Sequence, residues 1–261
     1  MTMLPAVSRW LTLAVTLALA ACVPHDRPAE LSPAARRSLA AAIRGDDNDA
    51  AGGLDTLRDA ARLAPDDAAA QQRYGFAAER SGLYPEALAA LDRAVAIGGA
   101  TPERLLAQGR IGLESGDVPA AARAYSRVLE ADPVNVEALN GVGVAEDLER
   151  HHELARERYN QALSLAPGDW RVRSNLAMSL LMSGHAEQAA DAVASADRDP
   201  AAPRRARHDL ALALVAAGRR EQAIGILRAN MPAVDAAALA DEFAAFARWL
   251  ASPEGSRPAV R

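Results

Sequence analysis

Two clusters of residues in this 261-residue sequence have the types that bind metal ions. The first is the adjacent pair His151-His152, which is followed by Glu153. Neighbouring side chains on a helix do not face one another, so the pair is a poor chelate. The favoured interpretation is an exposed polar turn. The acidic run Asp46–Asp49 lacks the alternating acids, central glycine and distal glutamate of an EF-hand loop, which favours a solvated loop. The sequence therefore predicts no metal site.

The side chains that usually carry covalent catalysis are also missing. All 29 basic residues are arginine, the only cysteine is Cys22, and no Gly-x-Ser-x-Gly elbow occurs. A chain without lysine has no phosphate-loop lysine and no Schiff-base lysine. The net charge of −5 provides no basic field for nucleic acid. We predict that the protein is not an enzyme and binds neither nucleic acid nor a small-molecule substrate, with an enzyme on a helical scaffold as the disfavoured alternative.

The single cysteine follows a short apolar segment. Arg9 precedes the run Trp10–Ala21, which is too short for a membrane-spanning helix and is typical of a signal peptide over residues 1–21. The stretch Leu19-Ala20-Ala21-Cys22 resembles the bacterial lipobox, which implies that Cys22 carries diacylglycerol and an N-acyl chain. We expect no cofactor other than this covalent lipid. Val23, by similarity to enterobacterial lipoprotein sorting, implies the periplasmic face of the outer membrane. Residues 22–33 then form a lipidated cysteine and a flexible tether.

The rest of the chain has the composition of helices. Alanine fills 64 positions and aromatic residues make up 4% of the chain, so helix formers dominate over strand formers. Small residues also recur with a period of 34, first as Gly75, Gly109 and Gly143 and then as Ala177 and Ala211. Twelve residues after each of these stands an alanine: Ala87, Ala121, Ala155, Ala189 and Ala223.

These columns resemble the tetratricopeptide repeat family over residues 68–237. Small residues at the eighth and twentieth positions let two helices approach closely, and glycine in the turn between them accepts positive φ. The resemblance implies an all-α, right-handed superhelical solenoid of five 34-residue helix pairs, at 68–101, 102–135, 136–169, 170–203 and 204–237. Residues 34–67 fit as a degenerate pair, with helices near 34–44 and 54–63 around an acidic loop.

The C-terminal end carries one more amphipathic segment. It covers 238–251, starting about residue 235, with Leu239, Phe243, Phe246 and Leu250 on one face. Because the last repeat has an apolar flank that must be covered, we expect a capping helix here. Residues 252–261 are expected to fray.

In the tetratricopeptide family the first helix of each repeat lines a groove, and the family's groove positions can be carried over. In repeats one and two they give a mixed polar surface: Gln72, Phe76, Glu79, Arg80, Glu103, Leu106, Arg110, Leu113 and Glu114. From the third repeat on they give an apolar strip with polar edges: Asn140, Val144, Leu148, Ser174, Met178, Leu181, Met182, His208, Leu212 and Val215. Such a strip suits an amphipathic helix or an extended peptide. Two alternatives stay open: the C-terminal helix of the chain itself fills the strip, or the methionines belong to the core between repeats.

Two stretches suggest a partner. Residues 171–189 and 208–228 resemble the fourth and terminal repeats of the TadD lipoproteins of the Flp, or tight-adherence, pilus machinery, although His208-Asp209 replaces the usual Gln-Asn. The resemblance implies a pilotin-like adaptor that binds an outer-membrane secretin or another pilus-assembly component. A type IV pilus pilotin and a general periplasmic scaffold for envelope assembly are the alternatives.

Overall fold

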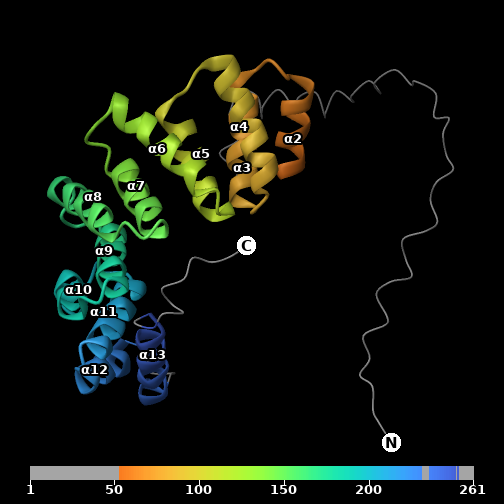
Figure 1. Cartoon of the computed structure of the whole chain (residues 1–261). Helices are drawn as coiled ribbons and strands as arrows, with labels where there is room; N and C mark the ends of the chain where they lie inside the picture. Colours follow the sequence, from red (N-terminus) through yellow and green to blue (C-terminus); the bar gives the residue numbers. More distant parts are fainter. Residues whose placement is uncertain (1–52, 231–234, 251, 253–261) are drawn as a thin grey trace, which may run out of the picture.

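The computed structural model describes residues 53–230, 235–250 and 252, and in these ranges every regular element is a helix. The prediction of an all-α solenoid is confirmed (Figure 1). The predicted signal peptide, the predicted lipidation site Cys22 and the predicted tether lie outside the described residues, as do the predicted helix near 34–44 and the acidic run Asp46–Asp49. None of the described helices is both long enough and apolar enough to cross a bilayer.

The helices come in antiparallel pairs that follow the 34-residue period. After α2 (Leu54–Leu63), the pairs are α3 (Ala68–Arg80) with α4 (Tyr84–Gly98), α5 (Pro102–Ser115) with α6 (Val118–Ala131), and α7 (Val136–Leu148) with α8 (His152–Leu165). Next come α9 (Trp170–Met182) with α10 (Ala186–Val193) and the 3₁₀ turn η1 (Ala194–Asp197), then α11 (Arg204–Ala216) with α12 (Arg220–Asn230). The chain of helices ends with α13 (Ala236–Leu250).

Short polar side chains and left-handed glycines set the helix boundaries. The carboxylate of Asp67 accepts hydrogen bonds from the first backbone N–H groups of α3, and that of Asp169 does the same for α9. Gly116 ends α5 with φ of 77°, a conformation that only glycine adopts without a steric cost. The same turn in the third repeat has Arg150 at φ of 68°, the only described non-glycine residue with positive φ.

Close helix contact explains the alanine column. All five alanines at the twentieth position are 0% exposed: Ala87, Ala121, Ala155, Ala189 and Ala223. Around Ala121 the fit is tight, because a Cβ added to Gly112 would lie 2.9 Å from the Ala121 Cβ. A larger side chain at this column would push the two helices of a repeat apart.

The pairs stack into an arc whose inner side is formed by the first helix of each repeat (Figure 1). Each first helix contacts the first helices of neighbouring repeats, from α3 with α5 through α9 with α11. At the C-terminal end α13 packs against both helices of the last repeat and reaches α9 of the repeat before it. It therefore both caps the stack and leans over the inner side of the arc.

Candidate functional site

The inner side of the arc is hollowed over the first three repeats. This open groove has a volume of about 670 Å³, within the range of ligand-binding clefts. Its lining comes mainly from α3, α5 and α7 and mixes charged, apolar and aromatic side chains: Phe76, Glu79, Arg80, Tyr84, Arg110, Ile111, Leu113, Glu114, Tyr125, Glu137, Asn140, Gly141 and Arg171. Six of the nine groove residues that the sequence analysis placed in repeats one and two are among them.

The centre of the open groove is a three-member ion network across three repeats. The Arg110 guanidinium donates to Glu79 at 2.7 and 3.2 Å and to Glu137 at 2.6 Å. Burial on its own lowers the pKa of Arg110, but the hydrogen bonds to the two carboxylates outweigh burial and raise that pKa above its ordinary value. Two carboxylates share one guanidinium, so the network holds an excess negative charge on a fixed frame.

Beneath this network lies Tyr125 of α6, which is 2% exposed. Its ring fits between two glycines, since an added Cβ would lie 2.5 Å from the ring at Gly109 and 2.4 Å at Gly141. Burial raises the pKa of the Tyr125 phenol, so the ring stays neutral. Phe76 and Leu113, which are half-buried, add apolar surface beside the charges. The groove is thus a preformed surface with both polar and apolar contacts.

The apolar strip that the sequence analysis favoured has a different environment. We call its part on α9 and α11 the covered strip, which comprises Ser174, Met178, Leu181, Met182, His208, Leu212 and Val215. Leu181, Leu212 and Val215 are only 8%, 7% and 9% exposed and belong to the same core cluster as residues of α13. The strip therefore serves largely as packing surface, and the alternative in which the C-terminal helix occupies it describes the structure better.

The three members of the predicted strip on α7 lie elsewhere. Asn140 lines the end of the open groove and accepts a hydrogen bond from Asn175 at 2.9 Å. Val144 packs partly buried against the core, while Leu148 is 54% exposed at the end of α7. Only Asn140 of the predicted strip thus belongs to the open groove.

Helix α13 is held over the strip by a few contacts. Phe243 meets His208 edge to face with ring centroids 5.2 Å apart. The Arg220 guanidinium donates to Asp241 at 2.8 Å and thereby fixes α13 to α12. Phe246, which was predicted on the buried face of this helix, is instead 39% exposed and stacks on the exposed Trp249.

The histidine pair in the third repeat divides into two environments. His152 turns inward, where its Nδ1 lies 2.8 Å from a carboxylate oxygen of Asp147, and Asp147 also accepts from Tyr159 and Ser179. This buried network joins α7, α8 and α9. His151 turns outward instead, so the two rings do not form a chelate together.

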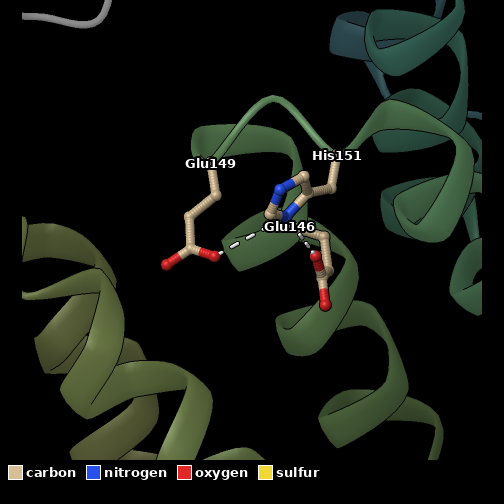
Figure 2. Close-up of side chains that lie close together, drawn as sticks. All are labelled: Glu146, Glu149 and His151. Atoms are coloured by element: carbon tan, nitrogen blue, oxygen red, sulfur yellow. Dashed lines mark hydrogen bonds and ion pairs between the residues drawn. The ribbon is translucent and has the colours of Figure 1, made fainter.

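The outward ring meets two carboxylates that the sequence analysis did not connect with it. His151 Nδ1 lies 3.0 Å from Glu146 Oε2 and 3.7 Å from Glu149 Oε2 (Figure 2). Among the described residues these three are the group that could hold a metal ion. Glu153 is not part of it. The sequence signal that could have found this group is the departure of Glu149 and Arg150 from the columns of the other four repeats. In the structure the left-handed turn at Arg150 folds His151 back toward the end of α7.

Sequence comparison agrees with the architecture. Residues 106–155 and 147–203 each match the tetratricopeptide repeat family. These matches span most of the second helix pair and the third and fourth pairs, which include nine of the thirteen residues that line the open groove. Residues 106–203, which are less than half of the chain, are therefore similar to tetratricopeptide repeats.

A curated relative is known from Sinorhizobium fredii, where it is described as the uncharacterized protein y4yS. It is 38% identical over 68 residues, which amount to 26% of this chain and 37% of the relative. The match thus spans about a third of the length of that protein.

Solved structures share the fold at low sequence identity. A tetratricopeptide repeat protein from Parabacteroides merdae superposes with a TM-score of 0.60 at 14% identity, covering 82% of each chain. The thermophilic protein TTC0263 from Thermus thermophilus gives 0.56 at 19%, covering 69% of this chain and 98% of its own. YrrB, described as a tetratricopeptide protein with an unusual peptide-binding site, gives 0.52 at 17%, covering 71% and 97%. Together these establish the solenoid fold.

Proposed function

We propose that this protein is a lipid-anchored periplasmic adaptor whose open groove binds an extended segment of a partner protein. The observation that carries the proposal is the groove itself, which crosses three repeats and is already shaped in the free chain. Repeats of this kind provide extended concave surfaces for protein partners. YrrB, whose description includes a peptide-binding site, shares the fold.

The groove residues suggest which chemical groups the partner segment carries. The lining as a whole is balanced in charge, with three arginines and three glutamates. At the centre Glu79 and Glu137 both accept from Arg110, so a backbone N–H of the partner would be favoured there. Phe76 and Leu113 offer apolar surface to a neighbouring side chain of the partner. Because the ion network holds Arg110 in place before binding, little side-chain ordering is needed when the partner binds.

The anchor is proposed from the sequence alone. Leu19-Ala20-Ala21-Cys22 resembles a lipobox, and residues 23–33 would hold the helical body away from the membrane. Three acyl chains on Cys22 would keep the adaptor at the membrane, since two chains already give stable anchoring. Anchoring raises the effective concentration of the adaptor near any membrane-bound partner.

The partner that we propose is the secretin of an Flp pilus, which makes the protein pilotin-like. This step is supported by the likeness of residues 171–189 and 208–228 to TadD lipoproteins. In this role the adaptor would hold a secretin segment in the groove at the outer membrane, without catalysing a reaction. A general envelope scaffold differs from this proposal only in the identity of the partner.

The test is complementation of a strain that lacks the gene. The double substitution Phe76→Glu with Leu113→Glu should leave the helical circular dichroism signal unchanged and abolish secretin multimers in the outer-membrane fraction. Its matched control, Leu154→Glu with Leu165→Glu, charges two exposed leucines of α8 that do not line the groove and should complement fully. Unchanged secretin multimers in the deletion strain would overturn the pilotin role.

The anchor has its own test. Cys22→Ala should abolish labelling by radioactive palmitate and release the protein from the membrane fraction. Labelling that persists in Cys22→Ala would overturn the anchor proposal while leaving the groove proposal intact.

A further inference from the structure

The turn between α7 and α8 differs from the corresponding turns of the other four repeats at three positions at once. The eleventh position is Glu146, where the other repeats have small or apolar residues. The fourteenth is Glu149, where they have serine or alanine, and the fifteenth is Arg150, where they have glycine. In the other four repeats the eleventh position is occupied by Ala78, Gly112, Leu180 and Leu214. The fourteenth is occupied by Ser81, Ser115, Ser183 and Ala217, and the fifteenth by Gly82, Gly116, Gly184 and Gly218.

Glu146 stands at a column that the other repeats use for packing. Ala78, Leu180 and Leu214 are 0%, 5% and 4% exposed. The side chain of Glu146 is only 26% exposed, so its carboxylate is partly withdrawn from water. Placing a carboxylate at such a position costs stability unless a positive group compensates for the lost hydration. Packing alone gives no reason for a glutamate here.

The backbone at Arg150 keeps the turn in the shape that the glycines give it. Its φ of 68° is close to the 71–80° of Gly82, Gly116, Gly184 and Gly218. A side chain at positive φ is strained, yet the turn still directs His151 back toward the end of α7 (Figure 2). The ring consequently lies between the carboxylates of Glu146 and Glu149.

The distances match those between ligands of a small cation. His151 Nδ1 is 3.0 Å from Glu146 Oε2 and 3.7 Å from Glu149 Oε2, and one ligand atom from each residue lies within 4.8 Å of the others. Two ligands of a tetrahedral ion with bonds of about 2.0–2.1 Å are separated by roughly 3.3 Å. The two distances lie on either side of that value, so only small side-chain rotations would be needed to close around an ion.

We propose that Glu146, Glu149 and His151 form a surface site for a divalent transition-metal cation of the zinc class. One imidazole and two carboxylates suit Zn²⁺ better than Mg²⁺ or Ca²⁺, which prefer ligand sets made of oxygen only. His152 takes no part, because its Nδ1 faces the buried Asp147. The fourth coordination position opens to solvent and is available to water or to a side chain of another protein.

The site is tested by isothermal titration of the purified chain with Zn²⁺. Every protein in the series carries Cys22→Ala, because an unlipidated thiol would bind zinc itself. The parent should bind one Zn²⁺. Glu149→Ser, which installs the residue of three other repeats, and His151→Ala should each weaken binding by about tenfold or more.

Two matched controls separate the site from general surface binding. His185→Ala removes the histidine at the same position of the fourth repeat, which has no carboxylates at the other two positions, and should leave the affinity unchanged. Arg150→Gly restores the glycine of the other repeats without removing a ligand and should also retain binding. Circular dichroism of each variant verifies the fold.

Three outcomes would overturn the proposal. These are no measurable Zn²⁺ binding by the parent, equal affinity in the parent, Glu149→Ser and His151→Ala, or equal affinity of the parent for Zn²⁺ and Ca²⁺. The test does not depend on the partner of the open groove, so it can fail or succeed independently of the proposed function.

Discussion

The inner side of the solenoid divides into an open N-terminal half and a covered C-terminal half, built from the same 34-residue repeat. In the open half the groove positions carry charges that pair across repeats, as Arg110 does with Glu79 and Glu137. In the covered half they carry aliphatic residues such as Leu181 and Leu212, and α13 packs over them. The difference indicates that side-chain polarity decides whether the groove stays open or is covered by the chain itself.

The largest difference in stability between the two halves should appear when a leucine of each half is replaced by glutamate. Leu181→Glu would bury a carboxylate without a partner and should lower the free energy of unfolding by about 3–5 kcal/mol. Leu113→Glu in the open groove stays in contact with water and should cost no more than about 1 kcal/mol. Urea denaturation followed by circular dichroism measures both. Equal losses would contradict the distinction between an open and a covered half.

Glycine substitutions test the packing under each half. Gly109→Ala would place a Cβ 2.5 Å from the Tyr125 ring and should destabilise the protein by about 1–3 kcal/mol through overpacking. Gly225 in α12 has nothing within 4 Å of such a Cβ, so Gly225→Ala should stabilise by about 0.5–1 kcal/mol. Thermal unfolding should shift in opposite directions for the two variants. A stabilised Gly109→Ala would show that Tyr125 does not fill the space under the groove.

One unfavourable polar group of the covered half is Asp209 of α11. Its Oδ2 is buried without a hydrogen-bond partner among the described residues, and burial raises the pKa of this carboxyl, opposed by a hydrogen bond from Ser174. The raised pKa means that the folded state favours the protonated form of Asp209. The contribution of this carboxyl group to the free energy of unfolding is therefore present at low pH and is lost as the pH rises through the folded-state pKa.

Asp209→Asn should therefore be more stable than the parent at pH 7, and the advantage should shrink as the pH falls toward about 4. Melting temperatures of both proteins at several pH values provide the measurement. An advantage that is constant with pH would show that the benefit has another cause than the buried charge.

The smallest effect is expected at the edge of α13. Arg220→Ala removes an exposed ion pair to Asp241, and such pairs contribute little. We expect the melting temperature to stay unchanged and amide exchange in α13 to rise about twofold to fivefold, with no change in α3. Hydrogen exchange with mass spectrometry resolves the two helices. A rise of equal size in α3 would mean that α13 is not a separately held element.

The repeat period, together with the resemblance to tetratricopeptide repeats that its columns carry, predicted the fold. The columns of glycine and alanine mark helix contacts and turns, and their spacing directly reflects close packing at Gly109 and Ala121. The groove positions of the tetratricopeptide family, carried over by resemblance, placed six residues of repeats one and two in the open groove. What the period could not give is the path of α13, because that helix follows the last repeat and its position depends on tertiary packing against α9 and α11.

The exact composition of the candidate sites was harder to predict for a related reason. Glu137 joins Arg110 from the first turn of the next repeat, at the same repeat position as Glu103, but the period does not predict that its carboxylate pairs with a guanidinium of the preceding repeat. Glu146 and Glu149 approach His151 only because Arg150 adopts positive φ, which residue type does not favour. Contacts between repeats and strained turns arise in three dimensions and leave little trace in the spacing of residue types.

The most direct test of the account is photo-crosslinking in cells that contain the proposed secretin partner. A photoreactive phenylalanine analogue at Leu113 lies in the open groove, whereas the same analogue at Leu165 lies on the exposed surface of α8. The account predicts that position 113 captures the secretin subunit and position 165 does not. Capture from position 165 alone, or from neither position, would contradict the claim that the open groove holds the partner.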